Sequence, residues 1–156
     1  MGMKLLCYST IRYVADVVQE SSVNIGVIVI SDTEHDGVCL ILPEFSRSIR
    51  FIDPLANVET IRHLLTSLRR RIGANYQTNM FAWEDERIIS SEQLKALAGA
   101  LRNQLQLTAP VPYRAVSLRS ASSELYRSMV RFGTKERLSS ENMTLEQLND
   151  RVPGGV

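Results

Sequence analysis

Strand-like apolar runs fill the first 42 residues of the chain. Residues 4–14, 23–30 and 38–42 are rich in β-branched and other strand-favouring side chains, which predicts three strands. Asp36 and Gly37 separate the second run from the third, and this pair predicts a tight turn with a positive φ angle. Three strands joined by short connections are typical of an antiparallel sheet.

From Asn57 onward the apolar spacing changes to three and four residues. A single stripe, closed by Gly73, predicts a helix over residues 57–72. Ser90 and Gln93 have the spacing of a capping box, which predicts a second helix over residues 90–105. Serines 120, 122 and 123 introduce a third predicted helix, and Thr144 begins a short fourth one. The apolar stripe of the first helix contains Ile61, Leu64, Leu65, Leu68 and Ile72.

A late strand is expected within residues 107–118. Pro110 and Pro112 require this strand to lie at an edge or to carry a bulge, because proline cannot donate a hydrogen bond to a neighbouring strand. The order of elements predicts an α+β fold, with a mainly antiparallel sheet of about four strands and helices on one face. We expect one domain over residues 1–135 and a separable C-terminal tail over residues 136–156.

Composition restricts the class of protein further. The chain has 156 residues, 44% of them hydrophobic and 22% charged, with a net charge of +1, which indicates a globular domain and excludes a uniformly basic nucleic-acid binder. The most apolar stretch, residues 23–31, is too short to span a membrane as a helix. No secretory leader is recognisable, so we expect a cytoplasmic protein without membrane partners.

Charge is distributed in blocks that the small net charge conceals. Residues 45–72 hold six arginines against two acidic residues, and residues 99–137 form a second basic block. Arg62 and Arg69 lie about 20° apart around the first helix, so they share one face. This face suits phosphates or an acidic partner, whereas the alternative is an ordinary solvated helix surface.

The first two strands bring together a polar group. If Arg12 pairs with Asn24 in antiparallel register, then Thr10 pairs with Gly26 and Tyr8 lies on the same face. A glycine inside a strand often marks a close approach to the backbone. These five residues are therefore a candidate binding surface. The alternative is that Arg12 and Asn24 stabilise the hairpin.

Catalytic and metal-binding signatures are absent from the sequence. No phosphate-binding glycine loop, nucleophile elbow or dinucleotide fingerprint is present, so no catalytic residue is assigned. His35, His63, Cys7 and Cys39 lack the spacing of metal ligands, and neither a metal nor a cofactor is expected. Both cysteines lie in apolar runs and are interpreted as buried small hydrophobic residues rather than a disulfide.

Two segments carry a family resemblance. Residues 8–16, from Tyr8 through Arg12 to Asp16, together with residues 23–27, resemble the opening motif of the bacterial domain-of-unknown-function family 3037. Residues 107–110 resemble its second motif. The resemblance covers roughly residues 5–132 and implies a small bacterial domain with an accessory or regulatory role, because some members are encoded beside kinase-like toxins.

The function expected from the sequence is a non-enzymatic interaction module in a bacterial regulatory, toxin–antitoxin or phage-defence system. Its partner would be another protein, such as a kinase-like toxin or a defence component. Arg12, Asn24 and the neighbourhood of Gly26 form the primary candidate surface, and Arg62 and Arg69 the secondary one. The alternative is a nucleic-acid-binding or nucleic-acid-processing protein that uses the two basic blocks.

Overall fold

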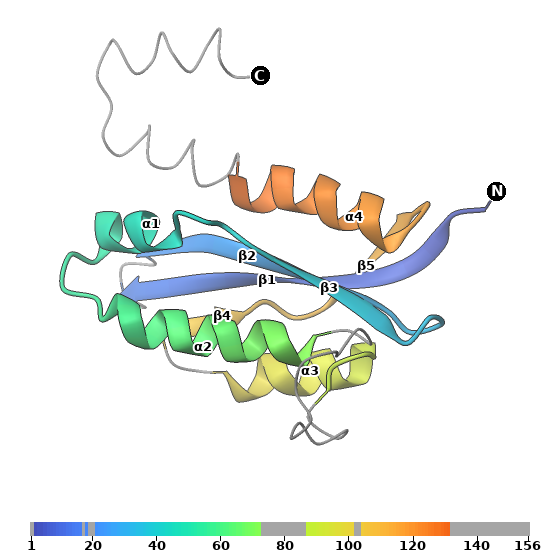
Figure 1. Cartoon of the computed structure of the whole chain (residues 1–156), viewed down its shortest axis with the longest axis horizontal. Coiled ribbons are helices and arrows are strands. Elements are labelled where there is room, and N and C mark those ends of the chain that lie inside the picture. Colours follow the sequence, from blue (N-terminus) through green and yellow to red (C-terminus); the bar gives the residue numbers. More distant parts are fainter. Residues whose placement is uncertain (1, 17, 19–20, 73–86, 102–103, 132–156) are drawn as a thin grey trace, which may run out of the picture.

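The fold is an antiparallel sheet enclosed between helices (Figure 1). The computed structural model describes residues 2–16, 18, 21–72, 87–101 and 104–131. The strands are β1 (Lys4–Asp16), β2 (Ser21–Ser31), β3 (Asp36–Ile41), β4 (Leu105–Leu107) and β5 (Val111–Ala115). The helices are α1 (Phe45–Ile52), α2 (Val58–Arg71), α3 (Ser91–Ala100), α4 (Leu118–Leu125) and the π-helix η2 (Tyr126–Arg131).

The five strands form one sheet in the order β3-β2-β1-β4, and β5 also pairs with β1. All of these pairings are antiparallel, which confirms the predicted α+β class. The strand expected late in the chain is divided in two, because β4 pairs with one end of β1 and β5 with the other. Pro112 lies in β5 at the margin of the sheet, as expected for a residue without an N–H group.

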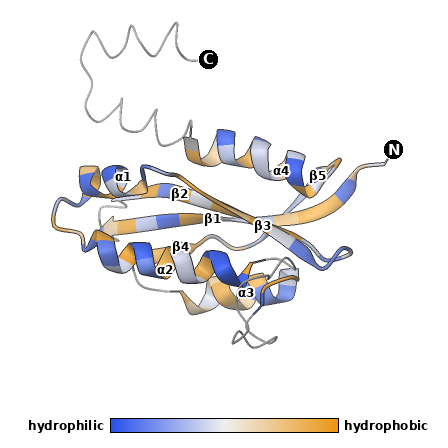
Figure 2. Ribbon diagram, viewed as in Figure 1, coloured by the Kyte–Doolittle hydropathy of each residue, from blue (hydrophilic) through white to orange (hydrophobic). Residues whose placement is uncertain are grey.

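Helices cover both faces of the sheet, which corrects the expectation of helices on one face. In Figure 1, α4 lies on one side of the strands and α2 and α3 on the other. The reason is the burial of β2, in which every residue from Ile25 to Ser31 is buried. A strand that is apolar on both sides needs cover on both sides (Figure 2).

A bulge in β2 separates two registers of the β1–β2 pair. Arg12 pairs with Asn24 as predicted, but Ile11 pairs with Gly26, which leaves Ile25 as an extra residue in β2. Beyond the bulge Thr10 therefore pairs with Val27 rather than with Gly26. The predicted placement of Gly26 beside Arg12 is wrong, because Gly26 shares the opposite face with Ile11.

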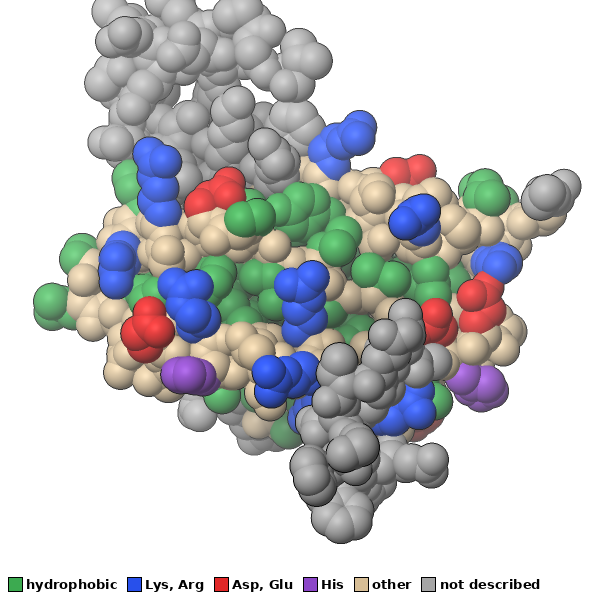
Figure 3. Space-filling view, viewed as in Figure 1, with side chains coloured by type: hydrophobic (Ala, Val, Ile, Leu, Met, Phe, Trp, Pro, Cys, Tyr) green, Lys and Arg blue, Asp and Glu red, His purple; other side chains and the backbone are tan. Residues whose placement is uncertain are grey.

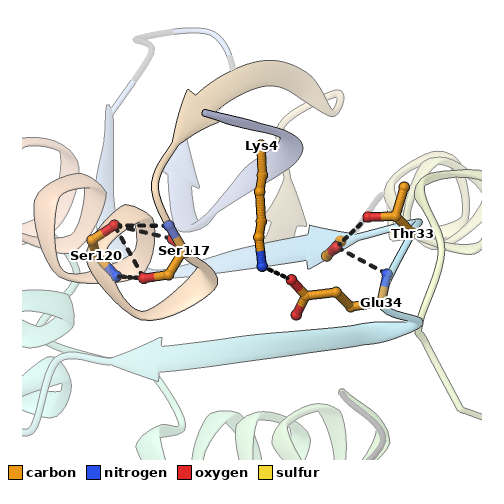
Figure 4. A network of polar contacts seen from close by, with 6 residues as sticks. Lys4, Thr33, Glu34, Ser117 and Ser120 are labelled. Atoms are coloured by element: carbon orange, nitrogen blue, oxygen red, sulfur yellow. Dashed lines mark hydrogen bonds and ion pairs between the residues drawn. The ribbon is translucent and has the colours of Figure 1, made fainter. Parts of the chain in front are cut away.

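The turn between β2 and β3 also differs from the expectation. The positive φ angle, 51°, belongs to His35, and Asp36 and Gly37 already belong to β3. Gly37 is needed for space, because a Cβ atom there would lie 2.5 Å from Cδ1 of Ile30. An ion pair between Lys4 and Glu34 joins this hairpin to the start of β1 (Figure 4).

Helix α2 begins where the apolar spacing predicts it. The side chain of Asn57 caps the helix by accepting a hydrogen bond from the backbone N–H of Thr60 at 3.2 Å. Just before the helix, the buried hydroxyl of Tyr13 donates to Asp53 at 2.5 Å and ties this connection to the sheet. Of the predicted stripe only Leu64 is exposed, at 47%, beside the shallow cleft between α2 and α3.

Serine caps mark the starts of α3 and α4. The Ser90 side chain accepts from the backbone N–H of Gln93, as predicted. The expected extent to residue 105 is wrong, because α3 ends at Ala100 and Leu105 begins β4. Ser117 and Ser120 form a reciprocal capping box at the start of α4 (Figure 4). The third predicted helix is therefore present, but it begins at Leu118, and serines 120, 122 and 123, which were expected to introduce it, lie inside it. The fourth predicted helix, from Thr144, lies outside the described residues.

Replacing Gly26 with alanine is expected to destabilise the protein. The new Cβ atom would lie 2.9 Å from both Cδ1 of Ile11 and the backbone oxygen of Leu40, so the sheet must shift. We expect Gly26→Ala to lower the free energy of unfolding by about 1–3 kcal/mol. Urea denaturation followed by circular dichroism measures this change.

Gly99→Ala is the matched control. A Cβ atom at Gly99 in α3 meets nothing within 4 Å, and alanine favours helices, so this variant should be as stable as the wild type or more stable. Equal stability of the two variants would contradict the packing described at Gly26.

Candidate functional site

A groove lies between the end of β3 and helix α2. Its volume is about 610 Å³, and apolar side chains line it together with three arginines of α2. The lining residues are Ile41, Leu42, Pro43, Phe45, Arg62, Leu65, Thr66, Arg69 and Arg70. Figure 3 shows hydrophobic side chains along the middle of this face, with Lys and Arg side chains above and below them. The arrangement combines an apolar floor with a positively charged border.

Arg62 is held in place by its neighbours. Its guanidinium lies over the ring of Phe45, 5.0 Å from the ring centroid, and its Nε lies 3.4 Å from Oε1 of Glu59. Phe45 is buried, so this contact fixes the arginine against the core. The ion pair with Glu59 is exposed and contributes little to stability, but it offsets part of the charge of Arg62.

Arg69 and Arg70 carry the uncompensated charge of the groove. Both side chains are exposed, and within the described part of the chain neither forms an ion pair. The positive charge of Arg69 also acts on the Cys39 thiol of β3, which places this arginine near the strand. The predicted pair Arg62 and Arg69 therefore lies on one surface, next to the end of the sheet.

The outer edge of β3 is open among the described residues. β3 is the first strand in the sheet order, and its only strand partner is β2. Leu42 N–H donates to the carbonyl of Ile25 directly opposite, so the alternation of antiparallel pairing turns Gly37, Cys39 and Ile41 away from β2. The Gly37 N–H bonds to its neighbour Asp36, as expected for an outward N–H group.

The primary surface expected from the sequence is partly built into the structure. Arg12 and Asn24 are neighbours, but the Asn24 side-chain amide donates to the backbone carbonyl of Met129 in η2 at 2.8 Å. Nε of Arg12 is buried, and no hydrogen-bond acceptor for it is present in the described regions. Asn24 thus holds η2 against the sheet rather than facing solvent.

Tyr8 and Thr10 are likewise engaged in internal contacts. The ring of Tyr8 packs edge-to-face on Tyr113, with 5.8 Å between the centroids, and the Tyr113 hydroxyl donates to Glu124. The backbone N–H of Thr10 donates to the side chain of Thr108 at 2.8 Å. These contacts join β1 to the chain after β4 and to α4.

Two arginines of the second basic block lie away from the arginines of α2. Arg62, Arg69 and Arg70 belong to α2, whereas Arg119 and Arg127 belong to α4 and η2 on the other face of the sheet (Figure 1). These two arginines therefore do not combine with those of α2 into one basic surface.

Sequence reasoning missed two features of the groove. The open edge of β3 depends on strand order, which the local sequence does not reveal. The apolar floor depends on α1, a helix that was not among the predicted ones and that places Phe45 under Arg62.

The described residues contain neither a cluster of metal ligands nor a membrane-spanning helix. No three His, Cys, Asp or Glu side chains in the described ranges are grouped so that they could hold a metal ion. No helix in the described part of the chain is both long and apolar enough to cross a membrane.

Comparison with known proteins assigns the family. The profile of the family described as "Protein of unknown function (DUF3037)" matches residues 8–130, which is most of the chain. The chain belongs to the DUF3037 family. The match includes β1, β2, β3 and α2, and therefore both sides of the groove. No curated protein and no solved structure matches the chain.

Both cysteines of this DUF3037 protein are free. Cys39 is buried as predicted, whereas Cys7 is only partly buried, and both thiols should react slowly in the folded state. Burial, opposed in part by Arg69, raises the pKa of Cys39 to about 12. Burial, reinforced by the charge of Asp32, raises the pKa of Cys7 to about 11. At pH 8 we expect slow reaction with a thiol reagent in the native protein and rapid reaction of both thiols in urea.

An exposed thiol provides the control for this experiment. Thr66 is exposed on α2, so Thr66→Cys should react rapidly without denaturant. The raised pKa values also imply that the unfolded chain ionises first, so stability should fall as pH rises above the ordinary thiol value of 9.0. Native thiols reacting as fast as unfolded ones would contradict this burial.

Proposed function

We propose that this DUF3037 protein is a non-enzymatic interaction module that binds an acidic segment of another protein in the groove between β3 and α2. The observation that carries the proposal is the juxtaposition of an apolar floor with Arg69 and Arg70, which form no ion pair among the residues that the structure describes. Arginine side chains pair with carboxylates through two parallel hydrogen bonds, and apolar floor residues supply buried contact area.

Charge complementarity favours an acidic protein over a nucleic acid. The described basic residues are divided between opposite faces of the sheet, so a duplex lying on α2 would not contact Arg119 or Arg127. The floor of the groove consists of aliphatic side chains and one buried phenylalanine, which offers no stacking platform for bases. Nucleic-acid binding is the competing outcome of the test below.

The regulatory, toxin–antitoxin or phage-defence setting is part of the proposal. It rests on the family resemblance alone, and a kinase-like toxin is the partner that this resemblance suggests. Arg12 and Asn24 remain a secondary proposed surface. Their contribution to partner binding would be indirect, because Asn24 positions η2.

The partner can be identified by crosslinking from the groove. In the full chain, Thr66→Cys places one exposed thiol beside Arg62 and Arg69, and a photoreactive maleimide attached there would crosslink to a bound protein in an extract of the native host. The crosslinked protein is then purified and its affinity for the unmodified chain is measured.

Charge reversal in the groove should weaken this complex. We expect Arg69→Glu combined with Arg70→Glu to raise the Kd at least tenfold, because two cations facing acidic groups become anions. Isothermal titration calorimetry at two salt concentrations measures the loss, and a larger loss is expected at low salt.

Arg119→Glu combined with Arg127→Glu is the matched control, because these exposed arginines lie on the other face. Unchanged affinity of the Arg69 and Arg70 variant would refute the groove as the docking site. Salt-sensitive binding of a DNA or RNA oligonucleotide, lost in the same variant, would support the nucleic-acid alternative instead.

A further inference from the structure

We propose that the partner segment enters the groove as an extended strand and pairs with the open edge of β3. This inference rests on the proposed function, and it specifies the conformation and chemistry of the bound segment. Strand addition to a free sheet edge is a recurrent mode of peptide recognition, in which backbone hydrogen bonds supply affinity and alternate side chains supply specificity.

The first argument is the state of the β3 backbone. Gly37, Cys39 and Ile41 direct their backbone groups away from β2, and within the described chain no strand pairs with this edge. The Gly37 N–H is already bonded to Asp36, so the N–H groups of Cys39 and Ile41 and the three carbonyls remain for a partner. A segment of about four or five residues would satisfy them.

The second argument is the sequence of this edge. Proteins usually protect an edge strand with inward charges, a lysine or a proline. Residues 37–42 contain no charged residue and no proline. A charged residue, Asp36, stands just before them, and a proline, Pro43, just after them. The accessible part is therefore bounded on both sides.

The third argument is the direction of the side chains. Cys39 and Ile41 point toward α2, since Arg69 acts on the Cys39 thiol and Ile41 lines the groove. Side chains of an added strand would alternate in the same way, so every second one would face the arginines. Arg62 and Arg69 are separated by about 10 Å along the helix, which lies between the roughly 7 Å and 13 Å spacings of strand side chains that are two and four residues apart and share one face. An acidic residue at alternate positions would reach both.

The same charges oppose a second copy of this chain. Joining two β3 edges would bring the α2 arginines of both molecules to one junction, where their charges repel. The occupant that fits best is therefore an extended segment with alternating acidic and apolar side chains, from a different protein.

The test uses a defined peptide. A fluorescein-labelled peptide of alternating Glu and Val residues should bind the full chain saturably, as measured by fluorescence anisotropy, whereas the same peptide with Lys in place of Glu should not. Arg69→Glu should raise the Kd for the Glu peptide at least tenfold, and Arg119→Glu should leave it unchanged.

Backbone methylation separates strand pairing from charge attraction. In an extended peptide, successive N–H groups point to opposite sides, so methylating one alternate set should abolish binding and methylating the other should not. In the protein, amide hydrogen exchange at Cys39 and Ile41 should slow at least tenfold on binding. Val38 and Leu40, already paired with β2, serve as internal controls.

Each contrary result has a distinct meaning. Strand addition would be overturned if both methylated peptides bound equally, if both lost binding equally, or if exchange at Cys39 and Ile41 did not change. These results would leave the crosslinked partner and its charge dependence intact. Failure of the Glu peptide to bind would also overturn it. A dimer in sedimentation, with these amides protected before peptide is added, would assign the edge to a second copy.

Discussion

The bulge at Ile25 determines which side chains of β2 face each of the two helical layers. It inserts one residue between the pairs Ile11–Gly26 and Arg12–Asn24, and a shift of one residue exchanges the faces of a strand. On one side of the bulge, Ile28 and Ile30 turn toward the α2 layer. On the other side, Asn24 turns toward η2 and bonds to Met129. Because β3 takes its register from β2, the bulge also directs Cys39 and Ile41 toward α2.

Elements with local signals were predictable from the sequence. The strand runs, the stripe of α2 and the serine cap of α3 each depend on residues within a few positions, and the structure confirms them. The third helix was also predicted, but its cap is Ser117 rather than serines 120, 122 and 123. The predicted register of β1 and β2 holds at Arg12 and Asn24 but fails beyond the bulge, where Thr10 pairs with Val27. Residues 25–30 are apolar apart from Gly26, so the pattern of side chains does not mark where the bulge lies or which of them face each helical layer.

The candidate site was less predictable than the fold because its parts are distant in sequence. The helical spacing correctly placed Arg62 and Arg69 on one face of α2. It could not reveal that this face lies beside an edge strand, since that depends on which strand ends the sheet. The polar cluster at Arg12 had the stronger local signal. The polar residue Asn24 within this apolar strand is explained by its contact with η2, because a partly buried asparagine needs a hydrogen-bond partner.

Two contacts fix the start of α2 and the Arg62 side chain at one end of the groove. The bond from Tyr13 to Asp53 fixes the chain just before α2, and Phe45 holds the Arg62 guanidinium at one end of the helix. Side chains that are fixed before binding lose less conformational entropy when a partner arrives. Arg69 and Arg70 form no ion pair within the described residues, so in the proposed complex they would supply long-range attraction rather than a fixed shape. Placing these charges on a neighbouring helix, instead of on the strand, leaves the β3 backbone accessible while still discouraging self-association. In this proposal the same arginines oppose pairing of two β3 edges and attract an acidic segment.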